Sequence, residues 1–150
     1  MAKQVDSYLA GSSELHTLIG LTPQQMEQFR GRAQFFIDGE HDERALIMLE
    51  MLEELDRKDA RPTLAAIDVL LRMGHSDAAK EKVAALKAKD AKNPNALVAE
   101  AALQIGMGEW GYAVSTLKEL AACDPDAKTD AGKRGRVLAG KAYAMFEANR

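Results

Sequence analysis

The fold is decided by residues 108–120, which read GEWGYAVSTLKEL. Shifting this stretch back by 34 residues, and then by 34 again, brings a similar set of small and large apolar residues into register. The matched positions are Gly108 and Gly74; Ala113, Ala79 and Ala45; Leu117, Val83 and Leu49; and Leu120, Leu86 and Leu52. In the earliest copy the glycine is Gly39, which stands one place early. Three matched sets at one interval indicate an internal repeat.

The length of the repeat predicts a pair of helices in each copy. An interval of this size holds two helices of about 12 to 14 residues and two short turns. The shared alanine lets the second helix approach the first closely, and the larger residues four and seven places later lie on the same helical face. Glycine near residues 39, 74 and 108 is expected to end each first helix, because a left-handed residue is easily accommodated there.

The interval divides the chain into segments with predicted roles. Residues 26–59, 60–93 and 94–127 are three repeats. Residues 1–25 form a lead with one short helix, and residues 128–150 form a helix that covers the last apolar face, as the ends of a repeat array require. The apolar residues that recur at helical spacing in this capping helix are Val137, Leu138, Ala142, Met145 and Phe146.

Composition favours helices and excludes several classes of protein. Alanine occurs 26 times, 22 of them after residue 50, while aromatic residues make up 5% of the chain. Helices favour alanine, whereas sheets favour branched and aromatic residues. No apolar run approaches the roughly 20 residues of a membrane span, and the first ten residues lack the pattern of a secretory signal. A sequence pI near 5.6 gives no reason to expect nucleic acid. We expect a cytoplasmic protein that binds neither membrane nor nucleic acid.

Few residues could carry chemistry. His41 and His75 stand 34 residues apart in equivalent turns, so they could form a metal site across the stacked turns. A polar solvated turn is the favoured interpretation, because zinc requires three or four ligands. The single cysteine, Cys123, cannot form an internal disulfide, which fits a reducing compartment. It has no histidine near it in sequence, so we predict a buried structural thiol. We expect no enzymatic activity, no cofactor and no metal.

Charge is unevenly distributed along the chain. Residues 38–59 hold nine acidic and three basic residues, a local charge of −6, and residues 128–150 hold six basic and two acidic residues, a local charge of +4. Such runs are usually solvated faces. The alternative is that the acidic end attracts a basic partner, or that the opposite ends attract each other in a homodimer.

The third repeat resembles the tetratricopeptide repeat family. Its matching residues are Ala101, Gly108, Trp110, Ala113, Leu117 and Pro125. The resemblance implies an all-α fold, a right-handed superhelical solenoid of three helix pairs with a C-terminal capping helix, in which the first helices line a concave groove. The groove residues implied by repeat position are Arg30, Gln34, Ile37, Leu64, Asp68, Leu71, Val98, Ala102 and Ile105. Such a groove suits an extended peptide or a helix.

Nearly the whole repeat region also resembles the small cytoplasmic chaperones of bacterial type III secretion, most closely from about Leu21 to Asp56. LTPQQMEQF (21–29) is similar to the opening of the class II chaperones that hold translocator subunits. GEHDERALIML (39–49) is as similar to related chaperones of export-apparatus or needle components. The resemblance implies a non-enzymatic chaperone that binds an aggregation-prone secreted subunit in the groove before export. The alternative is a general tetratricopeptide scaffold or adaptor without an export role. The client, the oligomeric state and the order of residues 1–20 stay open.

Overall fold

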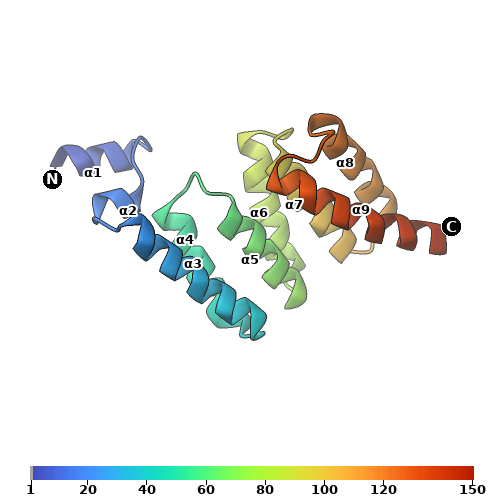
Figure 1. The fold of residues 1–150 in the computed structure, drawn as a ribbon, viewed down its shortest axis with the longest axis horizontal. Helices are drawn as coiled ribbons and strands as arrows, with labels where there is room; N and C mark the ends of the chain where they lie inside the picture. The colour runs from blue at the N-terminus through green and yellow to red at the C-terminus, as the bar shows by residue number, and fades with distance from the viewer. Residues whose placement is uncertain (1) are drawn as a thin grey trace. The chain divides into compact units, whose positions relative to one another are not determined.

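The computed structural model describes residues 2–150, and this range contains nine α-helices and no strand (Figure 1). The helices are α1 (Ala2–Leu9), α2 (Leu15–Leu18), α3 (Pro23–Asp38), α4 (Asp42–Leu55), α5 (Arg61–Arg72), α6 (Ser76–Lys89), α7 (Pro94–Gly106), α8 (Trp110–Cys123) and α9 (Asp130–Ala148). The all-α class and the succession of helix pairs are confirmed. The predicted lead had one short helix, which corresponds to α2; α1 was not predicted, and Met1 lies outside the described residues.

The chain divides into two compact units, one ending at Val69 and the other spanning Leu70–Arg150, so the division falls inside α5. In the first unit α3 packs on α4 and α2 contacts α4. In the second unit α7 contacts α6, α8 and α9, and α8 also contacts α9. These contacts make α7 the central helix of the second unit, and most of its side chains are buried.

The three alanines at the repeat interval are completely buried. Ala45, Ala79 and Ala113 are each 0% exposed. They begin the buried faces of α4, α6 and α8, which also include Leu49 and Leu117 four residues after the alanine. A larger side chain at these positions would hold the paired helices apart. Their complete burial is what the predicted close approach of paired helices requires.

The turns inside the three pairs share one geometry. The residues at positions 40, 74 and 108 have positive φ angles of 55°, 78° and 75°. In each turn the N–H group of the following residue donates to a carbonyl five residues back, as from His41 to Phe36 (2.9 Å) and from His75 to Leu70 (2.8 Å). This pairing is the Schellman arrangement, which satisfies carbonyls left free at a helix C-terminus. The repeat interval thus sets the backbone of the turns as well as the core.

The glycine of the first turn corrects the sequence-based prediction. Gly39 has a φ of −83°, and the left-handed residue is Glu40. Gly39 stands in a close contact instead, because a Cβ atom there would lie 3.1 Å from the ring of His41 and 3.3 Å from the carbonyl oxygen of Phe35. The first turn therefore keeps the register of the other two but carries a glutamate where they carry glycine.

Replacing Glu40 with glycine is expected to raise the free energy of unfolding by about 0.5 to 1 kcal/mol, because left-handed backbone is costly for residues with a Cβ atom. The matched change is Gly74→Ala, where an added Cβ meets nothing within 4 Å, so only the backbone is strained. It should lower the free energy of unfolding by about 1 kcal/mol. Urea unfolding of both variants tests the pair; a loss of stability in Glu40→Gly would contradict the assigned strain.

The capping helix α9 packs on α7 and α8 as expected, but two details differ from prediction. Ala142 is fully buried, whereas Val137 and Met145, which were expected on the packed face, are 75% and 39% exposed. Cys123, the last residue of α8, was expected to be buried and is exposed. The apolar residues of α9 therefore extend beyond the face of the helix that is buried against α7 and α8.

Candidate functional site

The candidate site of the first unit is built on α3, whose start is strongly fixed. Thr22 accepts a hydrogen bond from the backbone N–H of Gln25 (3.2 Å), and the Gln25 side chain accepts one from the backbone N–H of Thr22 (2.9 Å). This reciprocal capping box, with Pro23 at the first helical position, satisfies N–H groups that a helix start leaves free. Met26 and Ala33 are buried, so the opposite side of α3 faces solvent.

Arg30 has a structural task in the first unit. Its guanidinium lies 2.6 Å from Glu27 and 3.2 Å from Asp59, and its Nε finds no hydrogen-bond partner within residues 2–150. Asp59 also accepts from the side chain of Arg61 (2.8 Å). Burial alone would raise the pKa of Asp59, but the hydrogen bonds from Arg61 and the charges of Arg61 and Arg30 bring this pKa below its ordinary value. Arg30 therefore ties α3 to the start of α5.

The other groove residues predicted in the first unit are accessible to different degrees. Gln34 is exposed and donates to the carboxylate of Asp38 (2.7 Å). Ile37 and Leu64 are half-buried, and Asp68 is exposed. α3 and α5 thus present two partly accessible apolar side chains together with polar groups.

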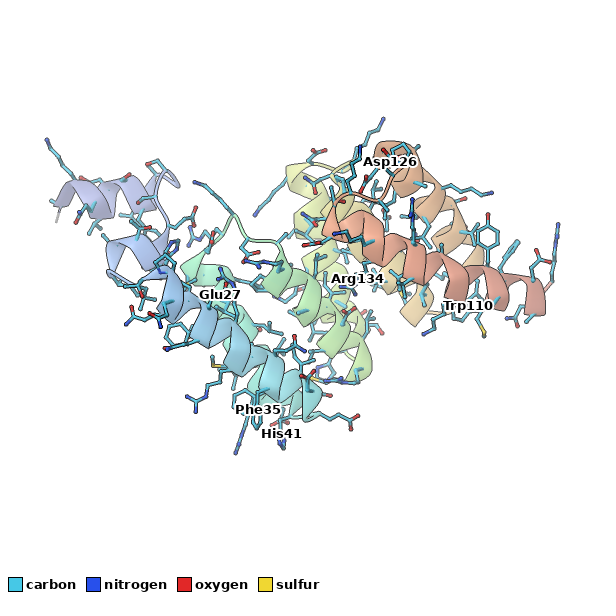
Figure 2. The ribbon with its side chains drawn as sticks, in the orientation of Figure 1. Glu27, Phe35, His41, Trp110, Asp126 and Arg134 are labelled. Carbon is cyan, nitrogen blue, oxygen red and sulfur yellow. The ribbon has the colours of Figure 1, made fainter. Side chains whose placement is uncertain are left out.

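Phe35 is a candidate contact residue that sequence reasoning missed. Its side chain is 67% exposed, and it projects from the end of α3 near the turn that carries His41 (Figure 2). The Phe35 and Phe36 rings meet edge to face with centroids 5.8 Å apart, and Phe36 meets the His41 ring at 6.3 Å. Its exposure could have been predicted from the sequence. Ala33 matches the small residue of the repeat and was expected to pack, and a residue two places later falls on the opposite side of the helix.

The predicted groove residues of the second unit are mostly core. Val98, Ala102 and Ile105 of α7 are 0%, 6% and 7% exposed, so in this conformation they cannot contact a ligand and the prediction for them is corrected. The helix that carries them, α7, contacts α6, α8 and α9, so it has neighbours on several sides. Leu71 is half-buried, and its side chain lies so close to Gly106 that a Cβ atom there would be 3.1 Å from Leu71 Cδ2.

The lead segment is held at the C-terminal end of α4. The Leu55 carbonyl accepts a hydrogen bond from His16 Nδ1 (2.8 Å), and the Glu14 carboxylate accepts one from the backbone N–H of Arg57 (2.9 Å). The Arg57 side chain also donates to the Tyr8 hydroxyl (2.8 Å). These contacts use carbonyl and N–H groups freed where α4 ends.

Neither a metal-binding cluster nor a membrane-spanning helix is found among the described residues. Within residues 2–150, no group of three or more His, Cys, Asp or Glu residues could hold a metal ion. No helix in the same range is long and apolar enough to cross a membrane. A cavity of about 70 Å³ between α8 and α9 is far below the roughly 300 Å³ of a typical ligand pocket.

No family model matches the chain, and no curated protein matches it. Solved structures do. The type III secretion translocator chaperone SycD of Yersinia enterocolitica is similar with a TM-score of 0.69 and 24% identity, over 91% of this chain and 98% of that one. A chain in a T3SS complex from Aeromonas hydrophila gives a TM-score of 0.70 and 20% identity, over 97% and 94%.

A third match is PcrH, known from Pseudomonas aeruginosa, in complex with the chaperone binding region of PopD. That structure is 23% identical, with a TM-score of 0.61, over 86% of this chain and 93% of PcrH. The resemblance to these chaperones is therefore confirmed at the level of the fold.

Proposed function

We propose that this protein is a non-enzymatic chaperone of type III secretion, which binds a secreted subunit in the cytoplasm and keeps it soluble before export. The observation that carries the proposal is the likeness to translocator chaperones over nearly the whole length of both chains. One of those neighbours is bound to the chaperone binding region of another protein, so the fold accommodates a protein client. Binding of the client removes it from self-association by mass action.

We infer that the client contacts the accessible residues of α3 and α5 in the first unit. Ile37 and Leu64 would provide half-buried apolar anchors, and Gln34 and Asp68 would provide polar contacts at their edge. Phe35 lies two residues before Ile37, on the other side of α3, so its exposed ring is not part of this surface. Partly buried apolar anchors with a polar rim are the usual composition of a peptide-binding surface.

The double variant Ile37→Gln/Leu64→Gln is expected to weaken binding of a translocator subunit about tenfold or more, because it removes two apolar anchors without adding charge. The readouts are the fraction of a co-expressed translocator subunit that stays soluble and its dissociation constant by calorimetry. Far-UV circular dichroism verifies that the helices persist.

The matched control is Leu9→Gln/Ile19→Gln, which removes two apolar residues of the lead that are 74% and 57% exposed. This control should bind the subunit as the natural sequence does. Loss of binding in the control alone would move the client site to the lead. Failure of the natural sequence to bind any secreted subunit would refute the chaperone function and favour the adaptor alternative.

A further inference from the structure

A small cavity lies between α8 and α9, which pack side by side in the second unit (Figure 1). Its volume is about 70 Å³ and its wall is mostly apolar, with Leu117, Leu120 and Ala121 on α8 and Gly135 and Ala139 on α9. Ala121 is exposed and Ala139 is half-buried, so the cavity opens to solvent along the seam between the two helices. The client contacts proposed for the first unit do not use it.

The space stays empty because only small side chains face it along the seam. A Cβ atom at Gly135 would collide with the Leu120 side chain, so α9 cannot come closer to α8 at this point. Ala139 on α9 and Ala121 on α8 have only methyl groups, which do not fill the gap. Protein interiors have few voids larger than a water molecule, so the apolar lining of this cavity lacks a packing partner.

The carboxylate in the cavity wall, that of Asp124, is already satisfied within its own turn. It accepts hydrogen bonds from the Thr129 hydroxyl (2.7 Å) and from the backbone N–H groups of Lys128 (2.9 Å) and Thr129 (3.0 Å). Asp126, in the same turn, is paired with Lys128 (2.9 Å). What the cavity offers an incoming group is therefore mainly apolar contact.

The volume of the cavity decides which apolar group fits. An apolar cavity of about 150 Å³ admits a benzene ring. The cavity between α8 and α9 has about half that volume, so it suits the branched end of a valine or leucine side chain and excludes an aromatic ring. One aliphatic side chain is therefore the largest apolar anchor that can enter.

Two cations flank the opening of the cavity, one from each helix. Arg136 lines the cavity and is exposed, and its guanidinium donates to the carbonyl oxygen of Pro125 (3.2 Å), which is a neutral acceptor. A guanidinium carries five N–H donors, so it can bind a carboxylate as well. Lys118 is exposed on α8, one turn before Ala121 on the same side of the helix. A partner that carries carboxylates complements these charges.

We propose that the cavity, together with Lys118 and Arg136, is a docking surface for an acidic segment of another protein. A single valine or leucine side chain of that segment enters the cavity, and carboxylates on either side of it pair with the two cations. The apolar anchor supplies most of the affinity, because exposed ion pairs contribute little, and the charges select the partner and its orientation. The surface belongs to the second unit, so it does not depend on the proposed chaperone function.

The probe is a short acetylated and amidated peptide in which one leucine stands between pairs of glutamates. Titrated into the isotope-labelled full chain, it should shift the amide resonances of Gly132, Gly135 and Ala139 in a saturable way, with a dissociation constant of about 1 mM or below. Replacing the leucine by phenylalanine, or the glutamates by lysines, should weaken binding at least about tenfold. No saturable shifts at these amides, or equal binding of all three peptides, would overturn the proposal.

Filling the cavity from its rim tests the apolar anchor. Ala121→Leu places a larger side chain at the opening and should weaken binding of the leucine peptide at least about tenfold. The matched control is Ala122→Leu on the next residue of α8, which is exposed and does not line the cavity. The control should bind as the natural sequence does. Unchanged binding in Ala121→Leu, or an equal loss in both variants whose spectra show intact helices, would contradict the assigned cavity.

Neutralising the two cations tests the charge selection. Lys118→Gln/Arg136→Gln should weaken binding of the acidic peptide about two- to fivefold for each pair lost, as exposed ion pairs do. Lys133→Gln/Lys141→Gln removes the same charge from exposed positions of α9 that do not line the cavity, and should change binding little. An equal loss in both variants would show unspecific attraction and overturn the proposal. Shifts of the same amides on raising the chain concentration alone would identify a second copy as the occupant, with the same consequence.

Discussion

Replacing Val98 with aspartate is expected to unfold the unit formed by Leu70–Arg150. Val98 is 0% exposed on α7, the helix that contacts α6, α8 and α9. An unpaired carboxylate in such a core costs several kcal/mol, and a natural domain is stable by only about 5 to 15 kcal/mol. Far-UV circular dichroism and urea unfolding measure the effect.

Ser115→Asp is the matched control, because Ser115 is exposed on α8. Its free energy of unfolding should stay within about 0.5 kcal/mol of the natural value. The opposing result is a Val98→Asp variant that keeps its helices and stability but no longer binds a client. That outcome would return Val98 to the groove, where its repeat position had put it.

The parts of the fold that follow from local chemistry could be predicted from the sequence. A small residue recurs every 34 positions, as closely packed helix pairs require, and these residues, Ala45, Ala79 and Ala113, are all fully buried. The cap formed by Thr22 and Gln25 was signalled by threonine and proline at a helix start, since capping depends on neighbours in sequence.

The parts that depend on which helices meet could not be predicted in the same way. Repeat position assigned Val98 to an open surface, but Val98 is 0% exposed on a helix that contacts α6, α8 and α9. The contacts of His16 with Leu55 and of Glu14 with Arg57 join residues that are 39 and 43 positions apart. No periodic pattern marks such pairs, because each is used once. The left-handed backbone of Glu40 was also not predicted. A left-handed residue at the end of a helix is expected to be glycine, and the glycine here, Gly39, stands one position before the left-handed residue.

Gly132→Ala is expected to lower the free energy of unfolding by about 2 to 4 kcal/mol, because it combines overpacking with the loss of a helix cap. The added Cβ atom would collide with the Asp124 carboxylate and lie 3.0 Å from the Cα atom of Ala127. Asp124 accepts hydrogen bonds from the Thr129 hydroxyl (2.7 Å) and from two backbone N–H groups. Thr129 in turn caps α9 by accepting from the N–H of Gly132 (3.0 Å). Displacing the carboxylate therefore disrupts the whole start of α9.

The pH dependence of stability gives the Gly132→Ala prediction a second readout. The hydrogen bond from the Thr129 side chain, followed by those from the N–H groups of Lys128 and Thr129, holds the pKa of Asp124 below its ordinary value. The stabilisation is therefore present above the pKa of the unfolded chain and is lost as pH falls through the lower folded pKa. The natural sequence should lose this contribution on acidification, whereas Gly132→Ala, which has already lost the network, should change less.

Gly140→Ala in the same helix should have the opposite sign. With nothing within 4 Å of the added Cβ atom, it should raise the free energy of unfolding by about 0.5 to 1 kcal/mol through helix propensity alone. Urea unfolding of both variants measures the difference. The two substitutions are chemically identical and eight residues apart, so their difference isolates what surrounds each glycine. If both substitutions changed the free energy of unfolding equally, the close contact between the start of α9 and the preceding turn would be contradicted.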